Sequence, residues 1–150
     1  MNVVVDTNVL VSAVLWKGPP YQALKNILER HSLVQSQSTI NEFDQVIRRE
    51  KFREILMQRG GTPEALVGAL ILESKFFAIS RRSAAQARRI SIEDKEDLIF
   101  LELALEAKAP IIVSGDNHLL ELRGIDQIRI VSAREFLALQ GDSEDLAPEA

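Results

Sequence analysis

The sequence predicts an α/β fold in which a parallel central sheet carries helices on both faces. Short runs of β-branched and aliphatic residues alternate along the chain with longer segments whose apolar residues recur at helical spacing. Strands that are separated by helices in this way form parallel sheets covered on both sides. The chain has 150 residues, of which 46% are apolar, and this is enough for one domain with a substantial core.

The opening strand brings an acidic residue to one end of the predicted sheet. Val3, Val4 and Val5 form an unbroken β-branched run, which is typical of a strand buried on both faces, and the run ends at Asp6. Apolar residues return at helical spacing from Val9 onward. Ligands bind at the carboxyl ends of strands in open α/β sheets. Asp6 is therefore either the first residue of a site or the cap of the following helix.

Prolines, glycines and apolar spacing define the elements that follow. The expected order is a turn at 17–20, a helix over 21–31, a strand at 33–34, a helix with its apolar stripe over 40–47, and a short helix through 55–56. Gly60 and Gly61 form a break, after which Thr62 caps a helix that begins with Pro63. We expect a third strand over 76–79.

The second half of the chain continues the alternation. A loop at 91–93 precedes a helix with apolar residues over 98–105, and the run 110–113 predicts a buried strand that ends before Asp116. The last strand is expected at 128–131 and the last helix at 133–139. The final residues, 141–150, are acidic and weakly apolar. We therefore expect one domain over residues 1–140 and a frayed or disordered tail.

The composition excludes several classes of protein. The chain contains no cysteine, which rules out disulfide frameworks, zinc–thiolate sites and cysteine nucleophiles, and which fits a reducing cytoplasm. It has no basic leader at its N-terminus and no apolar segment near the roughly 20 residues that span a bilayer, so we expect a soluble cytoplasmic protein. The net charge of −4 argues against a passive nucleic-acid binder but is compatible with an acidic, metal-binding active site.

Four acidic residues that are far apart in the sequence share one predicted location. Asp6 and Asp116 lie just past buried strands, whereas Glu42 and Asp97 fall in the first turns of predicted helices. In a doubly wound fold the helices begin at the edge where the strands end, so the four carboxylates could converge there.

Each acid also has a structural explanation. Thr39 to Glu42 has the spacing of a capping box, in which Glu42 would reach back to the backbone N–H of the cap. Asp97 belongs to the acidic segment 93–97, which the dipole of the predicted helix favours by itself. Asp6 and Asp116 could simply cap the helices that follow them. Their shared location, rather than any single residue, favours a functional site.

Clustered carboxylates indicate metal chemistry. Two like charges about 4 Å apart repel by about 4 kcal/mol at an effective dielectric constant near 20, and a divalent cation removes that repulsion directly. A ligand set made only of oxygen atoms indicates Mg²⁺ or Mn²⁺ rather than zinc. Such ions activate water and stabilise in-line displacement at phosphorus, so the pattern predicts metal-dependent phosphodiester hydrolysis.

Each acid lies within a longer segment of characteristic sequence. The four segments, within roughly residues 1–140, are VVVDTNVLVSAV, SQSTINEFDQVI, DKEDLIFLELALEAKA and PIIVSGDNHLLEL. Together they resemble the PIN domain family, and within it the toxin components of bacterial type II toxin–antitoxin pairs. The resemblance implies a three-layer α/β/α sandwich around a parallel, Rossmann-like sheet. It also implies a Mg²⁺- or Mn²⁺-dependent endoribonuclease acting on single-stranded RNA, with an antitoxin as partner and a homodimer as assembly.

The resemblance assigns a role to each candidate residue. One metal would be held mainly by Asp6, Asp97 and Asp116, with Glu42 completing the set or orienting the attacking water. The residues that would orient these ligands and the water are Thr7, Asn8, Ser114 and Glu96. His118 stands where the family often has another acid, so a second metal would bind weakly or only with substrate, unless Glu96 or Asp94 compensates.

Two basic groups could guide RNA to this acidic edge. The residues expected to do so are Arg48, Arg49, Lys51, Arg81 and Arg82. The alternative for each group is a solvated helix face with no role in binding.

Two other functions compete with the nuclease. A haloacid-dehalogenase-like phosphatase would use Asp6 as its nucleophile and Gly115-Asp116 as its later acidic motif. That chemistry normally needs acids where this chain has Asn8 and Leu120, and both departures weaken the interpretation. The other competitor is a non-catalytic protein-interaction module on the same fold, whose acids are only helix caps and surface charges.

Overall fold

The computed structural model of the chain describes residues 1–90, 95–116 and 127–146, without the side chains of residues 95, 96 and 142–146. Its centre is a sheet of five parallel strands in the order β3-β2-β1-β4-β5. The strands are β1 (Asn2–Val5), β2 (Ser32–Gln35), β3 (Ser74–Phe76), β4 (Ile111–Val113) and β5 (Arg129–Val131). The predicted parallel sheet is confirmed, with β1 at its middle.

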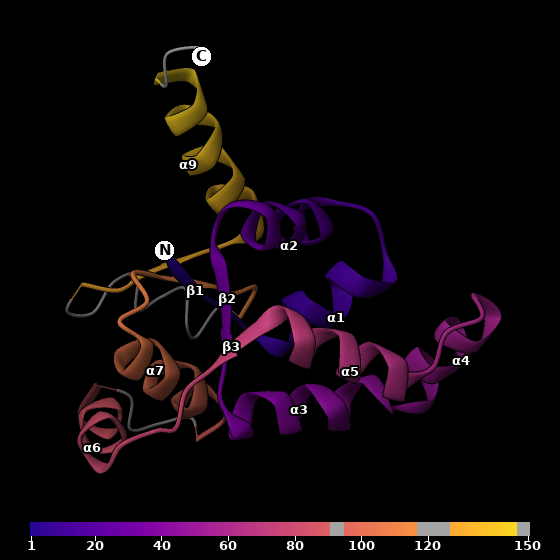
Figure 1. Cartoon of the computed structure of the whole chain (residues 1–150), viewed down its shortest axis with the longest axis horizontal. Helices are drawn as coiled ribbons and strands as arrows, with labels where there is room; N and C mark the ends of the chain where they lie inside the picture. The colour runs from indigo at the N-terminus through magenta and orange to yellow at the C-terminus, as the bar shows by residue number, and fades with distance from the viewer. Residues whose placement is uncertain (91–94, 117–126, 147–150) are drawn as a thin grey trace.

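Helices cover both faces of the sheet. Figure 1 shows α6 and α7 on one side of the strands and α1, α2, α4 and α5 on the other. The helices of the described residues are α1 (Thr7–Leu15), α2 (Pro19–Arg30), α3 (Gln37–Ile47), α4 (Glu50–Gln58), α5 (Pro63–Glu73), α6 (Arg81–Ile90), α7 (Lys95–Ala107) and α9 (Ala133–Leu146). Together with the sheet they form the predicted α/β/α arrangement. Among the described residues, no helix is both long enough and apolar enough to cross a membrane.

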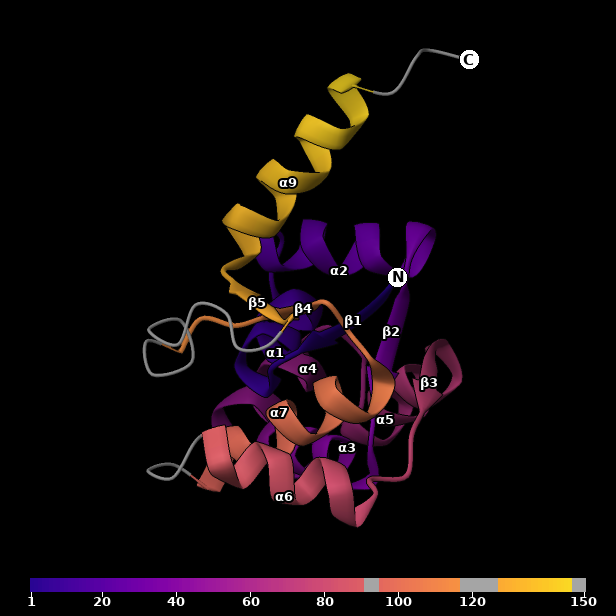
Figure 2. The same ribbon diagram turned by 90° about the vertical axis from the view of Figure 1, so that its left-hand side faces the viewer.

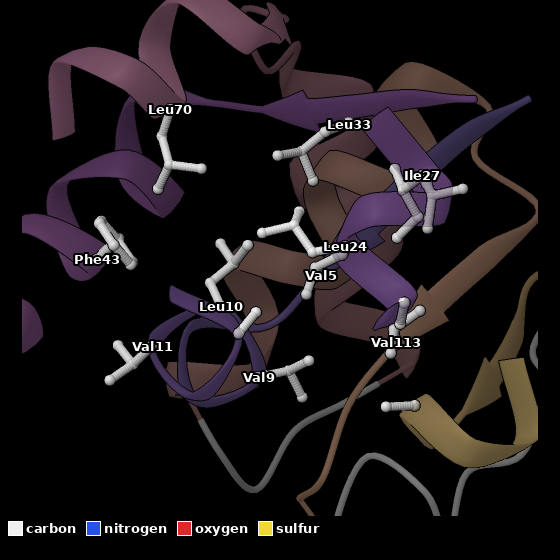
Figure 3. Packing of buried hydrophobic residues seen from close by; sticks show 14 of the residues in the cluster. Val5, Val9, Leu10, Val11, Leu24, Ile27, Leu33, Phe43, Leu70 and Val113 are labelled. Carbon is white, nitrogen blue, oxygen red and sulfur yellow. The ribbon is translucent and has the colours of Figure 1, made fainter. Parts of the chain in front are cut away.

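Alternating side chains of the central strands feed two separate cores. Val3 and Val5 of β1 belong to the larger core, which also contains residues of α1, α2 and α3, whereas Val4 belongs to a second core with residues of α7. Figure 3 shows Val5 of β1 and Val113 of β4 among the side chains of the larger core. Burial on both faces explains why the strand sequence is a continuous apolar run rather than an alternating one.

Three predicted element starts are wrong, and each error has a local cause. Helix α2 begins at Pro19, inside the predicted turn at 17–20, because proline suits the first turn of a helix. Helix α3 begins at Gln37 because Ser36, not Thr39, is its N-cap. The Thr39 N–H donates to Ser36 Oγ (3.2 Å) and the Ser36 N–H donates to Thr39 Oγ1 (2.9 Å), which completes a capping box three residues upstream of the predicted one. Strand β3 covers 74–76 rather than 76–79, because its register against β2 pairs Ser74 with Leu33.

The C-terminal end of the predicted domain also differs from the expectation. Helix α9 continues past residue 140 to Leu146, and Figure 2 shows its C-terminal part extending away from the sheet. Nothing between 140 and 146 breaks a helix outright, since Gly141 costs only about 1 kcal/mol relative to alanine. The division of the chain at residue 140 stays a prediction. The predicted loop at 91–93 and the helix after Asp116 lie outside the described residues.

Candidate metal centre

Asp6 is buried directly after the central strand β1, and its carboxylate is held by hydrogen bonds. The Val9 N–H donates to Asp6 Oδ1 (2.9 Å), so the side chain caps α1, and the Ser114 hydroxyl donates to Asp6 Oδ2. Ser114 follows β4, the strand beside β1, and its Oγ also accepts the N–H of Asp116 (3.0 Å). Capping and a place in a site are therefore compatible for Asp6, because the hydrogen bonds orient the carboxylate without neutralising it.

The charge on Asp6 is costly in the folded protein. The side chain is only 3% exposed, and this burial is the main cause that raises the pKa of Asp6 above its ordinary value. The negative charge of Asp116 raises it further, while the hydrogen bonds from Ser114, Val9 and Gly115 act in the opposite direction without cancelling the burial. A bound cation would supply positive charge beside this buried carboxylate.

We expect Asp6→Asn to stabilise the metal-free protein at neutral pH. Asn keeps an oxygen that can accept the Val9 N–H and removes the buried charge. Because the folded pKa of Asp6 is raised, the folded state binds a proton more tightly than the unfolded state. The contribution of Asp6 to wild-type stability must then fall as pH rises from the ordinary pKa of aspartate through the raised one.

Chemical denaturation in EDTA at pH 8 and at pH 5 measures this effect. The free energy of unfolding of Asp6→Asn should exceed that of the wild type by more at pH 8 than at pH 5. The increase for Asp6→Ala should be smaller, because this variant also loses the cap of α1. If Asp6→Asn is no more stable than the wild type at pH 8, or if its extra stability grows as pH falls, the charge of Asp6 is not costly in the folded protein.

Glu42 comes from the second turn of α3 and is held by the first residue of α1. The Thr7 hydroxyl donates to Glu42 Oε2 at 2.6 Å, and the Thr7 side chain is only 5% exposed. The predicted capping role of Glu42 is wrong, since Ser36 and Thr39 cap α3 without it. Glu42 is instead oriented toward the end of β1 from a neighbouring helix.

Asp97 and Asp116 complete the set of four acids. Asp97 lies in the first turn of α7 and is 5% exposed, and Asp116 is half-buried two residues after Ser114. Together with Asp6 and Glu42 they line one cavity of about 180 Å³. The residues that share its wall are Thr7, Asn8, Val46, Arg49 and Phe100. The structure thus brings the four predicted acids together from β1, α3, α7 and the segment after β4.

The chemistry of the donor set fits a hard divalent cation. Four carboxylates line a small cavity, two of them almost completely buried, and oxygen atoms of this kind are the ligands that Mg²⁺ and Mn²⁺ prefer. Within the described part of the chain, no three acidic or histidine side chains already stand in an arrangement that could hold a metal ion.

The residues expected to orient the ligands differ in their contacts with the four acids. Thr7 and Ser114 hydrogen-bond Glu42 and Asp6 directly, and Asn8 is an exposed residue of the cavity wall. Their proposed action on ligands and water stays a prediction. The side chain of Glu96 and the residues Asp94 and His118 lie outside the described part of the structure.

The sequence did not single out the apolar side of the cavity. Val46 and Phe100 are buried side chains of its wall. Val46 follows Glu42 by four residues in α3, and Phe100 follows Asp97 by three in α7, so each shares a helix face with an acid. That spacing is the signal that could have identified them.

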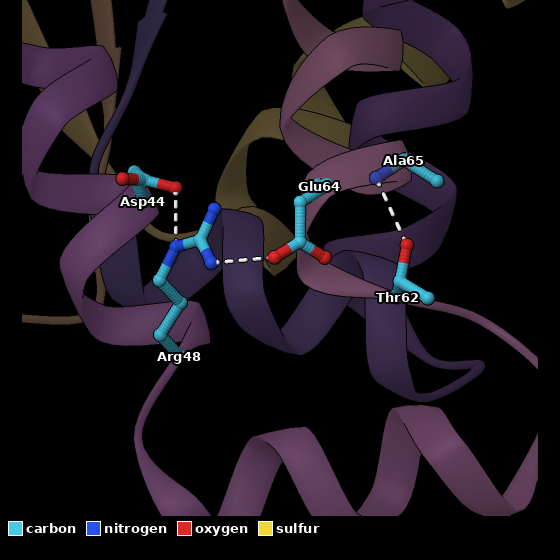
Figure 4. A network of polar contacts seen from close by, with 5 residues as sticks. All are labelled: Asp44, Arg48, Thr62, Glu64 and Ala65. Carbon is cyan, nitrogen blue, oxygen red and sulfur yellow. Dashed lines mark hydrogen bonds and ion pairs between the residues drawn. The ribbon is translucent and has the colours of Figure 1, made fainter.

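The predicted RNA-guiding residues separate into distinct environments. Arg49 lines the acidic cavity, whereas Arg48 donates from Nε to Asp44 Oδ1 (2.8 Å) and from Nη1 to Glu64 Oε1 (2.7 Å), as Figure 4 shows. Lys51 lies over the ring of Phe52, with Nζ 4.8 Å from its centroid. Arg81 and Arg82 lie on the exposed surface of α6. A guiding role for these residues stays a prediction.

Comparison with known proteins decides the family. A family model of the PIN domain matches residues 2–118, which is most of the chain and contains all four acids. The chain belongs to the PIN domain family. PIN domain proteins are generally nucleases, and they generally use divalent metal ions. This agrees with the acidic cavity and argues against the phosphatase interpretation.

A solved structure supports the PIN fold independently. The chain is similar to VapBC2 from Rickettsia felis, determined bound to a DNA fragment from its promoter, with a TM-score of 0.62 and 14% sequence identity. The match covers 87% of this chain and 97% of the other. At this identity the likeness establishes the fold alone. A search of curated protein sequences finds no match.

Proposed function

We propose that this PIN domain is a Mg²⁺- or Mn²⁺-dependent endoribonuclease that hydrolyses phosphodiester bonds in single-stranded RNA. The observation that carries the proposal is the cavity lined by Asp6, Glu42, Asp97 and Asp116. Four carboxylates repel one another in a small cavity, and Asp6 has a raised pKa because it is buried there. A site with this charge favours a divalent cation over an empty state.

The proposed roles follow from the contacts of each side chain. Asp6, Asp97 and Asp116 would hold the cation, and Glu42, oriented by the Thr7 hydroxyl, would complete the set or orient the attacking water. A bound divalent cation would supply positive charge that polarises the phosphodiester and makes water more acidic. Ser114 would keep the Asp6 carboxylate aligned, since it donates to Asp6 Oδ2.

We further propose that the protein is the toxin of a toxin–antitoxin pair, works in the cytoplasm and forms a homodimer. The similarity to the VapBC2 structure supports an antitoxin partner. A second observation is an apolar groove of about 870 Å³ that shares no residue with the acidic cavity, lined in part by the exposed side chains of Trp16 (46%) and Tyr21 (39%). Exposed apolar surfaces of this kind mark protein–protein contacts, and we assign this groove to the antitoxin.

The direct test is cleavage of a single-stranded oligoribonucleotide by the purified protein. We expect cleavage with Mg²⁺ or Mn²⁺ and none in EDTA, and no release of phosphate from a phosphomonoester such as p-nitrophenyl phosphate. Phosphomonoester hydrolysis without RNA cleavage would support the phosphatase alternative. Activity on neither substrate, together with no stabilisation by metal, would support the non-catalytic module.

The contact between Thr7 and Glu42 gives a quantitative prediction. Thr7→Val removes the hydroxyl that donates to Glu42 Oε2 but keeps a side chain of similar shape at this buried position. Loss of such an orienting partner typically costs about 10- to 100-fold in metal affinity or activity. We expect RNA cleavage to fall by about this factor, whereas Thr7→Ser, which keeps a hydroxyl, should retain most of it. Equal cleavage by Thr7→Val and wild type would show that the Thr7 hydroxyl does not orient Glu42 for catalysis.

A further inference from the structure

Arg49 is the one basic residue among those that line the acidic cavity within the described structure. Its side chain is exposed, and it makes no ion pair with any described residue. Its neighbour Arg48 is engaged by two carboxylates, Asp44 and Glu64. Two adjacent arginines that look equivalent in the sequence therefore have different environments: Arg48 is held by two carboxylates, whereas Arg49 lines the cavity.

The backbone around Arg49 fixes where its side chain starts. Arg49 lies between α3 and α4, with an extended conformation (φ −57°, ψ 142°) at the N-cap of α4. Its N–H donates to the Val46 carbonyl (3.1 Å), and its own carbonyl accepts the N–H groups of Phe52 (3.0 Å) and Arg53 (2.9 Å). Val46 itself is a buried part of the cavity wall. The Arg49 side chain thus starts from a hydrogen-bonded backbone at the edge of the cavity rather than from a loose surface loop.

The negative charge of the cavity explains why RNA binding needs a positively charged side chain beside it. A single divalent cation would offset only two of the four carboxylates, so the site would still repel the anionic backbone of RNA. A guanidinium binds phosphate oxygens through two parallel N–H bonds and stays positively charged. Arg49 is placed to offer this attraction at the point where the substrate meets the acids.

We propose that Arg49 is a catalytic residue that binds a non-bridging oxygen of the scissile phosphodiester. This role rests on the proposed nuclease function. During hydrolysis the oxygen of a water molecule forms a bond to phosphorus and one bridging P–O bond breaks. The proton of the water passes to a cavity carboxylate, and the leaving ribose oxygen takes a proton from solvent. Arg49 neither gains nor loses a proton, and it stabilises the negative charge that builds up on the non-bridging oxygens.

A different role for Arg49 makes opposite predictions. If Arg49 served only as a counter-ion that holds the carboxylates together, its removal would weaken metal binding or the fold. If it binds substrate, its removal leaves the carboxylates intact and makes the site more negative, so Mn²⁺ should bind at least as well as to the wild type. Cleavage and metal binding therefore have to be measured on the same variants.

The test compares Arg49→Ala and Arg49→Lys with Arg53→Ala, which removes one exposed arginine of α4 that does not line the cavity. Single-turnover cleavage of an oligoribonucleotide at saturating enzyme isolates the chemical step. We expect the rate constant of Arg49→Ala to fall by about 10²- to 10³-fold, as for loss of a donor to a developing oxyanion. Arg49→Lys should fall less, because it keeps the charge but not the paired donors. Arg53→Ala should stay within about two-fold of wild type.

Three results would overturn part of the account, and they are distinguishable. If the wild type cleaves RNA and Arg49→Ala cleaves equally fast, Arg49 does not bind the scissile phosphate. If Arg49→Ala loses the rise in melting temperature with Mn²⁺, Arg49 organises the carboxylates instead. If the wild type itself neither cleaves RNA nor gains stability with Mn²⁺, the proposed function fails, and this role fails with it.

Discussion

Asp97→Asn and Asp6→Asn are each expected to lower RNA cleavage by about 10³-fold or more while the fold survives. Both acids line the cavity and are almost completely buried, and each would be a principal ligand of the cation. A catalytic metal contributes several kcal/mol of transition-state stabilisation, and each 1.4 kcal/mol corresponds to about a tenfold change in rate. Asn is close in shape to Asp, so the loss would reflect charge rather than packing.

Asp44→Asn is the matched control for this prediction. Asp44 is also an acid of α3, but it pairs with Arg48 on the surface and does not line the cavity. Exposed ion pairs contribute about 0–1 kcal/mol, so this change should leave both cleavage and stability nearly unchanged. Cleavage that persists in both Asp6→Asn and Asp97→Asn would remove these residues from the catalytic set.

Mn²⁺ is expected to raise the melting temperature of the wild-type protein by about 5–10 °C at a concentration near 100 times its dissociation constant. A ligand that binds only the folded state stabilises it by about 2.7 kcal/mol at that concentration, and a domain of this size gains about 2–4 °C per kcal/mol. Because the cation offsets the cost of the buried Asp6 carboxylate, we expect a low dissociation constant, so that the rise appears at a low Mn²⁺ concentration.

Variants of the cavity separate this effect from unspecific stabilisation by salt. Asp97→Asn should show a much smaller rise with Mn²⁺, whereas Asp44→Asn should respond like the wild type, because only Asp97 lines the cavity. Melting curves in EDTA provide the baseline for each variant. A rise of equal size in all three proteins would indicate that Mn²⁺ binds elsewhere, and no rise in the wild type would favour the non-catalytic module.

The sequence predicted the location of the acids well because that location follows from topology. Val3–Val5 and Ile111–Val113 read as buried strands, and parallel strands end at one edge, so Asp6 and Asp116 had to lie near each other. The same argument placed the start of α7, and with it Asp97, at that edge. The alternation of strands with helices and the parallel direction of the strands hold along the whole chain. Errors at the ends of single elements therefore did not change the predicted location of the acids.

Local choices between similar residues could not be predicted. Ser36 and Thr39 are both good caps, and the choice depends on where β2 ends and on the hydrogen bond from Thr39 Oγ1 to Gln35 Oε1 (2.6 Å). The ends of β3 depend on its register against β2, which its own sequence does not contain. Arg48 and Arg49 are adjacent, but Arg48 ends α3 in a helical conformation and pairs with Glu64, whereas Arg49 is extended at the N-cap of α4, a difference set by the junction of the two helices.

The central claim is that one divalent cation binds among Asp6, Asp97, Asp116 and Glu42. Crystals soaked in Mn²⁺ and measured near the manganese absorption edge test it most directly. We predict an anomalous peak inside the cavity, with carboxylate oxygens of Asp6, Asp97 and Asp116 at metal–ligand distance, and no such peak in Asp97→Asn crystals. Absence of the peak from the wild-type cavity, or a peak held by other residues, would contradict the account.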